Sequence, residues 1–160
     1  MASDTSKLGE VFSPNRLLVL LAGGGVGEFV LEFFAWWGVP AALGRPMRPD
    51  ILVADLARSL FGAHIPVVLA ASIHLLLGFF IFPLIFAVGR ALIGFRTTLV
   101  PAAIFGVILW AIAQTTLAPL AGRPFMLGLI PYTWASLILH VVYTVVFALT
   151  IDKLSRANAH

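Results

Sequence analysis

Five polar side chains in this sequence have the types and spacing that chemistry needs, and all five interrupt long apolar stretches: Glu28, Glu32, His74, Gln114 and His140. Glu28 and Glu32 are four residues apart, which places them on one face of a helix. Carboxylates and imidazoles transfer protons, and they are ligands for zinc, manganese and iron. The elements that carry these residues decide whether they can meet.

The composition is that of a membrane protein. Of the 160 residues, 61% are hydrophobic and 11% are charged, and the mean hydropathy is +1.04. A soluble domain carries about 25% charged residues, because it must present a wetted surface. A membrane span needs about 20 apolar residues. The sequence predicts one all-α integral membrane domain over residues 1–160, with spans at residues 17–38, 65–89, 98–120 and 129–151.

The connections between these spans predict their arrangement. Short turns around Gly94 and Gly122 force neighbouring spans to be antiparallel, which favours a four-helix bundle. Residues 39–64 form the only long connection. It opens with prolines and then repeats Leu52, Leu56 and Leu60 at helical spacing, which predicts a short amphipathic helix over residues 50–61 in the headgroup region. A soluble helix that caps the bundle is the alternative.

The five polar residues are expected at similar depths. With a rise of about 1.5 Å per residue, Glu28, His74 and His140 lie roughly 14–16 Å from one membrane surface, near the midplane. Glu32 and Gln114 lie roughly 9 Å deep in the same half. An ionisable group at the bilayer centre costs about 2.5–3.5 kcal/mol, so such groups face the protein interior and find partners. We therefore expect a common interior cluster.

Four interpretations of this cluster are open. The first is a hydrogen-bonded polar lock that sets the register of the helices, since polar contacts between membrane helices contribute about 0.6 kcal/mol on average. The second is haem b held between His74 and His140. The third is a transition-metal site with Glu28, Glu32, His74 and His140 as ligands. The fourth is proton or ion transport, because buried Glu and His residues form relays in pumps.

Other classes of function have little support. The sequence has no cysteine, which excludes disulfides, thiolate nucleophiles and cysteine metal sites. No basic stripe supports nucleic-acid binding, and no nucleophile elbow supports a hydrolase. We expect a non-enzymatic component of a membrane assembly, with the lipid bilayer and other membrane subunits or further copies of the chain as partners.

The distribution of basic residues predicts the orientation. One side carries Lys7, Arg16, Arg90, Arg96, Lys153 and Arg156, and the other carries Arg45, Arg48, Arg58 and Arg123. The excess on the first side favours both termini in the cytoplasm.

Several motifs carry a resemblance to a known family. A glycine-rich first span ends in GVP…GRP, the second span contains His74 and closes with IFAVGR, and the last reads LILHVVY…TIDKL. With Ala118–Pro119 at the end of the third span, these motifs resemble the YagU-like family of small bacterial inner-membrane proteins of unknown function. The resemblance implies the same four-span fold and a bacterial inner-membrane location, and it implies no functional residues.

Overall fold

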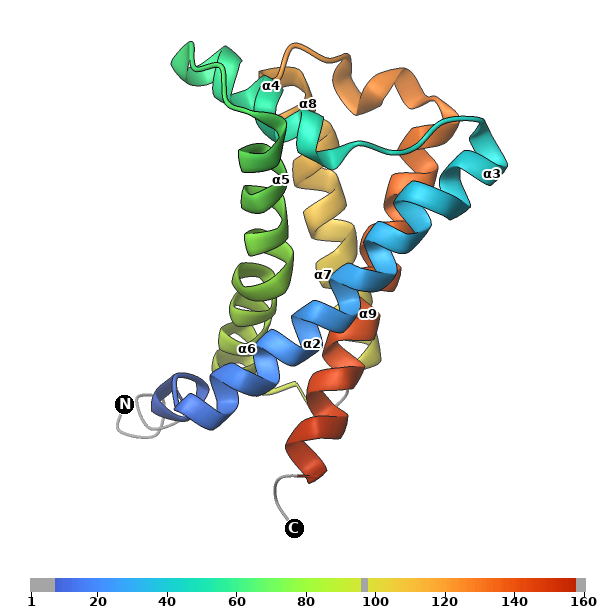
Figure 1. The fold of residues 1–160 in the computed structure, drawn as a ribbon. Helices are drawn as coiled ribbons and strands as arrows, with labels where there is room; N and C mark the ends of the chain where they lie inside the picture. Colours follow the sequence, from blue (N-terminus) through green and yellow to red (C-terminus); the bar gives the residue numbers. More distant parts are fainter. Residues whose placement is uncertain (1–7, 96–97, 158–160) are drawn as a thin grey trace.

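The computed structural model describes residues 8–95 and 98–157, so Lys7 and Arg96 of the orientation argument lie outside the described residues. Four helical segments are long and apolar enough to cross a membrane: Pro14–Leu43, Val67–Ile93, Leu99–Leu120 and Pro131–Ala157. The predicted all-α fold with four spans is confirmed, and Figure 1 shows the segments in blue to cyan, green, yellow and orange to red, from the first to the fourth. The first span extends beyond the predicted bounds at both ends, the second and fourth begin two residues later and end later than predicted, and the third agrees to within one residue.

Three of the four segments are interrupted by a π-helical turn. The first consists of α2 (Pro14–Phe33), η1 (Phe34–Gly38) and α3 (Val39–Leu43). The second consists of α5 (Val67–Leu76), η2 (Leu77–Ile81) and α6 (Phe82–Ile93). The third consists of α7 (Leu99–Ile112), η3 (Ala113–Leu117) and α8 (Ala118–Leu120), and the fourth is the single helix α9 (Pro131–Ala157).

Prolines explain the π turns. Each turn ends two residues before a proline, at Pro40, Pro83 or Pro119. A proline inside a helix lacks an N–H, and its ring clashes with the carbonyl four residues earlier. In all three segments that carbonyl belongs to the π turn, where the backbone bonds to the residue five positions back rather than four. The wider turn therefore accommodates the ring without ending the helix.

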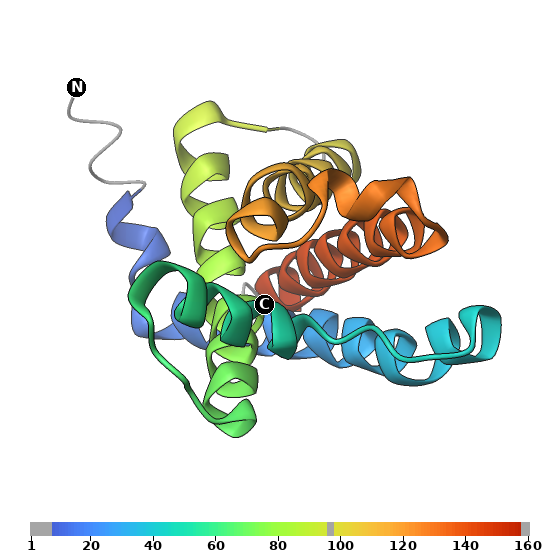
Figure 2. The ribbon, with the colours of Figure 1, turned by 90° about the horizontal axis from the view of Figure 1, so that it is seen from above.

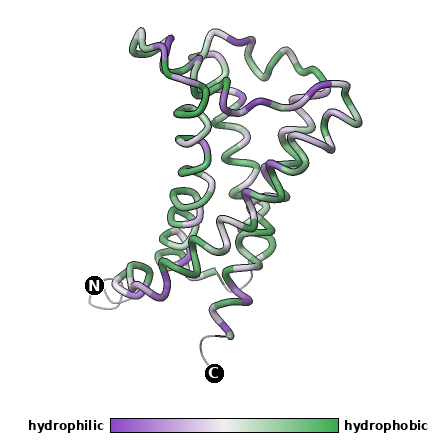
Figure 3. Tube along the Cα trace, in the orientation of Figure 1, coloured by the Kyte–Doolittle hydropathy of each residue, from purple (hydrophilic) through white to green (hydrophobic). Residues whose placement is uncertain are grey.

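The connections lie at two ends of the molecule. The helix α4 (Pro49–Phe61) joins the first two spans, as predicted, and it packs against α5. Its residue Asp55 forms an ion pair of 2.9 Å with Arg123, next to the 3-10 turn η4 (Phe125–Leu129). Figure 3 shows hydrophilic residues gathered at this end and at the end with the termini, with mostly hydrophobic spans between. We call these the α4 end and the terminal end.

The helices α2 and α9 form the centre of the bundle. Gly23 and Gly27 of α2 lie against Phe147 and Tyr143 of α9. The π turn η2 packs on the other side of α2, and α7 packs on α9. Viewed along the bundle, α9 lies between α2 and α7 (Figure 2). Outward-facing apolar side chains on α5 and α7 are exposed, as expected of faces that contact lipid.

A polar cluster joins the spans at the terminal end. Asp152 of α9 accepts hydrogen bonds from the Arg90 guanidinium of α6 and from the Thr98 hydroxyl at the start of α7. We call these three residues the Asp152 cluster. Arg16 of α2 donates to the Ser155 hydroxyl nearby on α9. The IFAVGR and TIDKL motifs thus meet in space, through Arg90 and Asp152.

Candidate functional site

Glu28, Glu32 and His74 lie together between α2 and α5. The Nε2 atom of His74 is 3.2 Å from Oε1 of Glu28 and 3.3 Å from Oε1 of Glu32. One ligand atom from each residue lies within 4.8 Å of the other two. We call these residues the Glu–Glu–His site. The one-turn spacing of the glutamates brings both carboxylates to the same imidazole nitrogen.

The contacts within the site are close, but they lack hydrogen-bond geometry. Oε1 of Glu28 and Nε2 of His74 are buried and have no hydrogen-bond partner among the described residues. The Glu28 side chain is only 2% exposed. Leaving a buried polar group unsatisfied costs about 1–3 kcal/mol, and more when the group is charged. The site therefore contains two buried polar atoms that no described side chain or backbone group satisfies.

Gly78 provides the space for the Glu28 carboxylate. A Cβ atom on this residue would overlap with Oε1, Oε2 and Cδ of Glu28. Its carbonyl oxygen accepts a hydrogen bond of 2.6 Å from the Tyr143 hydroxyl of α9. In a regular α-helix this carbonyl would bond to the N–H of Phe82, but in η2 that N–H bonds to Leu77. Tyr143 thus satisfies a carbonyl released by the π turn.

The second carboxylate is oriented from the α4 end. Trp36 Nε1–H donates a hydrogen bond of 2.7 Å to Oε2 of Glu32, which leaves Oε1 directed at His74. The Arg48 guanidinium lies over the Trp36 ring, 5.0 Å from its centroid. Hydrogen bonds to the far oxygen of a carboxylate are typical support for a metal ligand, because they fix its orientation.

Gln114 and His140 lie in a separate group around Ser136. Gln114 Nε2 donates to the Ser136 hydroxyl over 3.3 Å, joining η3 to α9. The His140 Nδ1 atom is 2.7 Å from the Ser136 carbonyl oxygen and 3.4 Å from its hydroxyl. Of the five predicted residues, three therefore form the Glu–Glu–His site, and the other two form this Gln–Ser–His group on the other side of α9.

The haem hypothesis meets a geometric obstacle at His74. A bis-histidine haem needs one nitrogen from each imidazole free to bind iron from opposite faces. Nε2 of His74 already faces two carboxylate oxygens at 3.2 and 3.3 Å. A haem iron would have to displace both carboxylates from this nitrogen.

Two residues of the site were missing from the prediction. Tyr143 is 2% exposed and contacts η2 through its hydroxyl. Its signal in the sequence was indirect: Pro83 releases a carbonyl of η2, and a buried tyrosine hydroxyl needs a partner. Trp36 lies one helical turn after Glu32 in the sequence, and this spacing was the clue to its hydrogen bond with the Glu32 carboxylate.

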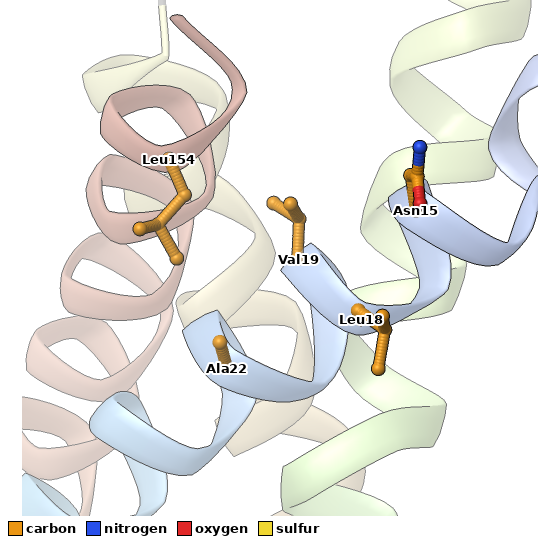
Figure 4. A pocket seen from close by; sticks show the side chains of 5 residues that line it. All are labelled: Asn15, Leu18, Val19, Ala22 and Leu154. Atoms are coloured by element: carbon orange, nitrogen blue, oxygen red, sulfur yellow. The ribbon is translucent and has the colours of Figure 1, made fainter. Parts of the chain in front are cut away.

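The cavity shown in Figure 4 does not belong to this site. It has a volume of about 430 Å³ and lies at the terminal end, where it is lined by Leu18, Val19 and Ala22 of α2 and by Leu154 of α9. Asn15 contributes its amide at the rim. No acid, base or metal ligand lines it, and we assign it no chemistry.

Comparison with known proteins places the chain in a family. No curated protein and no solved structure matches it. The family described as "Family of unknown function (DUF6789)" matches residues 14–160, which include all four spans and the Glu–Glu–His site. The YagU-like resemblance is not named by this match and stays a prediction. The chain belongs to DUF6789, a family of unknown function.

Proposed function

We propose that this membrane protein binds a divalent transition-metal ion inside the bilayer, with Glu28, Glu32 and His74 as its three protein ligands. The main supporting observation is that Oε1 of Glu28 and Nε2 of His74 are buried, have no hydrogen-bond partner in the part of the chain that the structure describes, and lie 3.2 Å apart. Both atoms can bind a metal ion. A metal ion would satisfy both.

The distances between the donor atoms support a metal ion. Zinc binds imidazole nitrogen and carboxylate oxygen at about 2.0–2.2 Å, so neighbouring ligand atoms in a tetrahedral site are about 3.3–3.5 Å apart. The nitrogen of His74 is 3.2 and 3.3 Å from the two carboxylate oxygens. Three protein ligands leave a fourth position open, as in zinc sites that bind water or a substrate.

The charges also support a divalent ion. Two carboxylates and one neutral imidazole carry a total charge of −2, which one divalent cation neutralises. A protonated imidazole with the same two carboxylates leaves a net charge of −1 inside the bilayer, where charge is costly. Imidazole and carboxylate together suit zinc, manganese or iron(II).

An accessory role in a larger membrane assembly is the second candidate. The side chains of His74 and Glu32 are 19% and 25% exposed, so the Glu–Glu–His site opens toward the outside of the chain. Polar groups at this depth are usually covered by protein. A helix of another subunit, or of a second copy, would cover this opening and complete the metal site. We propose the bacterial inner membrane as its location, with both termini in the cytoplasm.

The test is metal stoichiometry on detergent-purified full-length protein. The protein is loaded with zinc, manganese or iron(II), dialysed, and measured by elemental analysis. We expect about one equivalent of one of these metals in the natural sequence. We expect Glu28→Gln and His74→Ala each to lower the bound metal at least tenfold, because each removes one ligand. Glu28→Gln does so while it keeps the shape of the side chain.

His140→Ala is the matched control, because this histidine also lies inside the membrane but contacts Ser136 instead of the carboxylates. It should retain full metal occupancy. A natural sequence that binds no metal would overturn the proposal. So would full occupancy in a folded Glu28→Gln variant. Proton flux in vesicles that is lost in Glu28→Gln, without any bound metal, would favour transport instead.

A further inference from the structure

An apolar groove runs along the outside of the bundle at the α4 end, between the first span and α9. Its volume is about 660 Å³. One wall consists of Phe34, Gly38, Val39, Ala42 and Leu43, and the other consists of Leu129, Pro131, Trp134, Ala135, Ile138 and Leu139. The spacing on each wall is that of one helix face. The groove therefore follows the helices for about 13 Å, from the edge of the membrane toward its interior.

A positive charge lies near the outer end of the groove, beyond the residues that line it. Leu43 and Pro131 line this end, Tyr132 follows Pro131 directly, and Arg45 lies two residues after Leu43. The Arg45 guanidinium is 5.5 Å from the centre of the Tyr132 ring, and the Tyr132 hydroxyl donates to the Arg45 carbonyl over 2.6 Å. Arg45 is exposed and forms no ion pair within the described part of the chain, whereas Arg48, Arg58 and Arg123 each pair with an aspartate.

The groove is open on one side, and its volume of about 660 Å³ is less than the roughly 1,000 Å³ of a helix about 13 Å long, so a helix would enter it only in part. A single acyl chain is slimmer and matches the apolar walls. Each methylene buried against such walls contributes about 0.8 kcal/mol, and an anionic headgroup next to Arg45 would supply the opposite charge.

From this geometry we propose that the groove binds one chain of an anionic phospholipid, with its phosphate at Arg45. This goes beyond the metal site, because it concerns other residues and another ligand class. Tyr132 holds the Arg45 backbone in place, and the groove fixes where the chain lies. Specificity for an anionic lipid comes from Arg45, and affinity for any lipid comes from the apolar walls.

Native mass spectrometry of the full chain, titrated with phosphatidylglycerol or phosphatidylcholine, tests this proposal. We expect phosphatidylglycerol to remain bound about tenfold better than phosphatidylcholine. Arg45→Gln should remove this preference while some binding of both lipids remains. Ala42→Trp, at an exposed position in the groove wall, should block both lipids.

Two control variants show whether the loss of any arginine at this end, or a tryptophan at any nearby position, has the same effect on lipid binding. Arg58→Gln removes an exposed arginine from the same end of the molecule and should keep the preference. Ala41→Trp adds the same bulk at an exposed residue outside the groove and should keep the binding. Equal retention of both lipids by the natural sequence, or unchanged binding in Ala42→Trp, would overturn the proposal. Dissociation of a dimer by Ala42→Trp would also overturn it and would assign the groove to a second copy.

Discussion

At the residue scale, the position of Glu28 depends on the absence of a side chain at Gly78. The carboxylate occupies the place that a Cβ atom would take. The distance between Glu28 and His74 thus depends on a third residue, which is not one of the proposed ligands. This makes it possible to disturb the site without removing any of its donor atoms.

We predict that Gly78→Ala reduces metal binding although all three ligands remain. The added methyl group must push the Glu28 carboxylate away from His74, because the carbonyl of Gly78 is held by Tyr143 and the backbone cannot easily retreat. Elemental analysis should show at least a tenfold loss. Tyr143→Phe frees that carbonyl and should give a smaller loss. Full metal occupancy in Gly78→Ala would contradict this account of the site.

A second residue-scale prediction concerns pH and the start of α4. Arg48 Nε and Nη2 donate to both oxygens of Asp50, over 2.9 and 2.5 Å. These hydrogen bonds lower the pKa of Asp50 below its ordinary value of 3.8. The resulting stabilisation is complete above about pH 4 and is lost as the pH falls through the lower folded-state pKa. Because Arg48 is partly exposed, we expect about 1 kcal/mol.

Thermal unfolding in detergent from pH 7 to pH 2 measures this contribution. Asp50→Asn should be less stable than the natural sequence at pH 7, and the difference should shrink below pH 4. Arg48→Gln should show the same loss at pH 7. A difference between Asp50→Asn and the natural sequence that stays constant down to pH 2 would show that the ion pair does not contribute.

At the element scale, each π turn lies just before a proline, but the presence of a proline alone does not predict a π turn. Pro83 and Pro119 lie within predicted spans and were treated as part of continuous helices. Pro40 lies just after the first predicted span and was treated as its end. The helices themselves followed from hydropathy, since four stretches of the required length occur. The π turns did not follow, because a proline can also kink a helix or end it.

The contact between α2 and η2 gives a prediction at this scale. Gly24 lies against the carbonyl of Phe79, and a Cβ atom on Gly24 would overlap with it. In a regular helix this carbonyl would pair with the N–H of residue 83, which is a proline. We expect Gly24→Ala to separate the two elements and to lower the free energy of unfolding by about 2–3 kcal/mol.

Gly89→Ala is the matched control for this substitution. Gly89 is also helical, but nothing lies within 4 Å of a Cβ placed there. Alanine should stabilise α6 at this position by about 0.5–1 kcal/mol, from helix propensity alone. Thermal unfolding of both variants in the same detergent gives the comparison. Equal effects of the two substitutions would mean that the close contact at Gly24 does not hold the spans together.

At the scale of the whole molecule, the sequence could not predict which of the polar residues would meet. Glu28, Glu32 and His74 meet as expected. His140 and Gln114 come from the same predicted layer but meet at Ser136 instead. Depth follows from counting residues along a helix, whereas partners depend on the order of the helices and their rotation. Because α9 lies between α2 and α7, its two faces hold different polar groups.

The Asp152 cluster is the last feature to test, because it joins three spans at the terminal end. The Asp152 carboxylate accepts hydrogen bonds from Arg90 of α6 and from Thr98 before α7, and the Asp152 side chain is 14% exposed. Removing one partner of such a partly buried pair leaves the other charge unpaired. We therefore predict that Asp152→Asn and Arg90→Gln each lower the free energy of unfolding by about 2 kcal/mol.

A double-mutant cycle shows whether the two residues act through each other. If they do, the double variant loses less free energy of unfolding than the two single variants together, and the difference, the coupling energy, is at least about 1 kcal/mol. Arg156→Gln, an exposed arginine on the same helix, should change stability by less than about 0.5 kcal/mol. Metal occupancy should stay complete in all these variants, because the contacts of the Glu–Glu–His site come from α2, α5, η1, η2 and Tyr143 of α9, and none comes from the Asp152 cluster. Additive losses at Asp152 and Arg90 would instead mean that the two residues stabilise the spans independently.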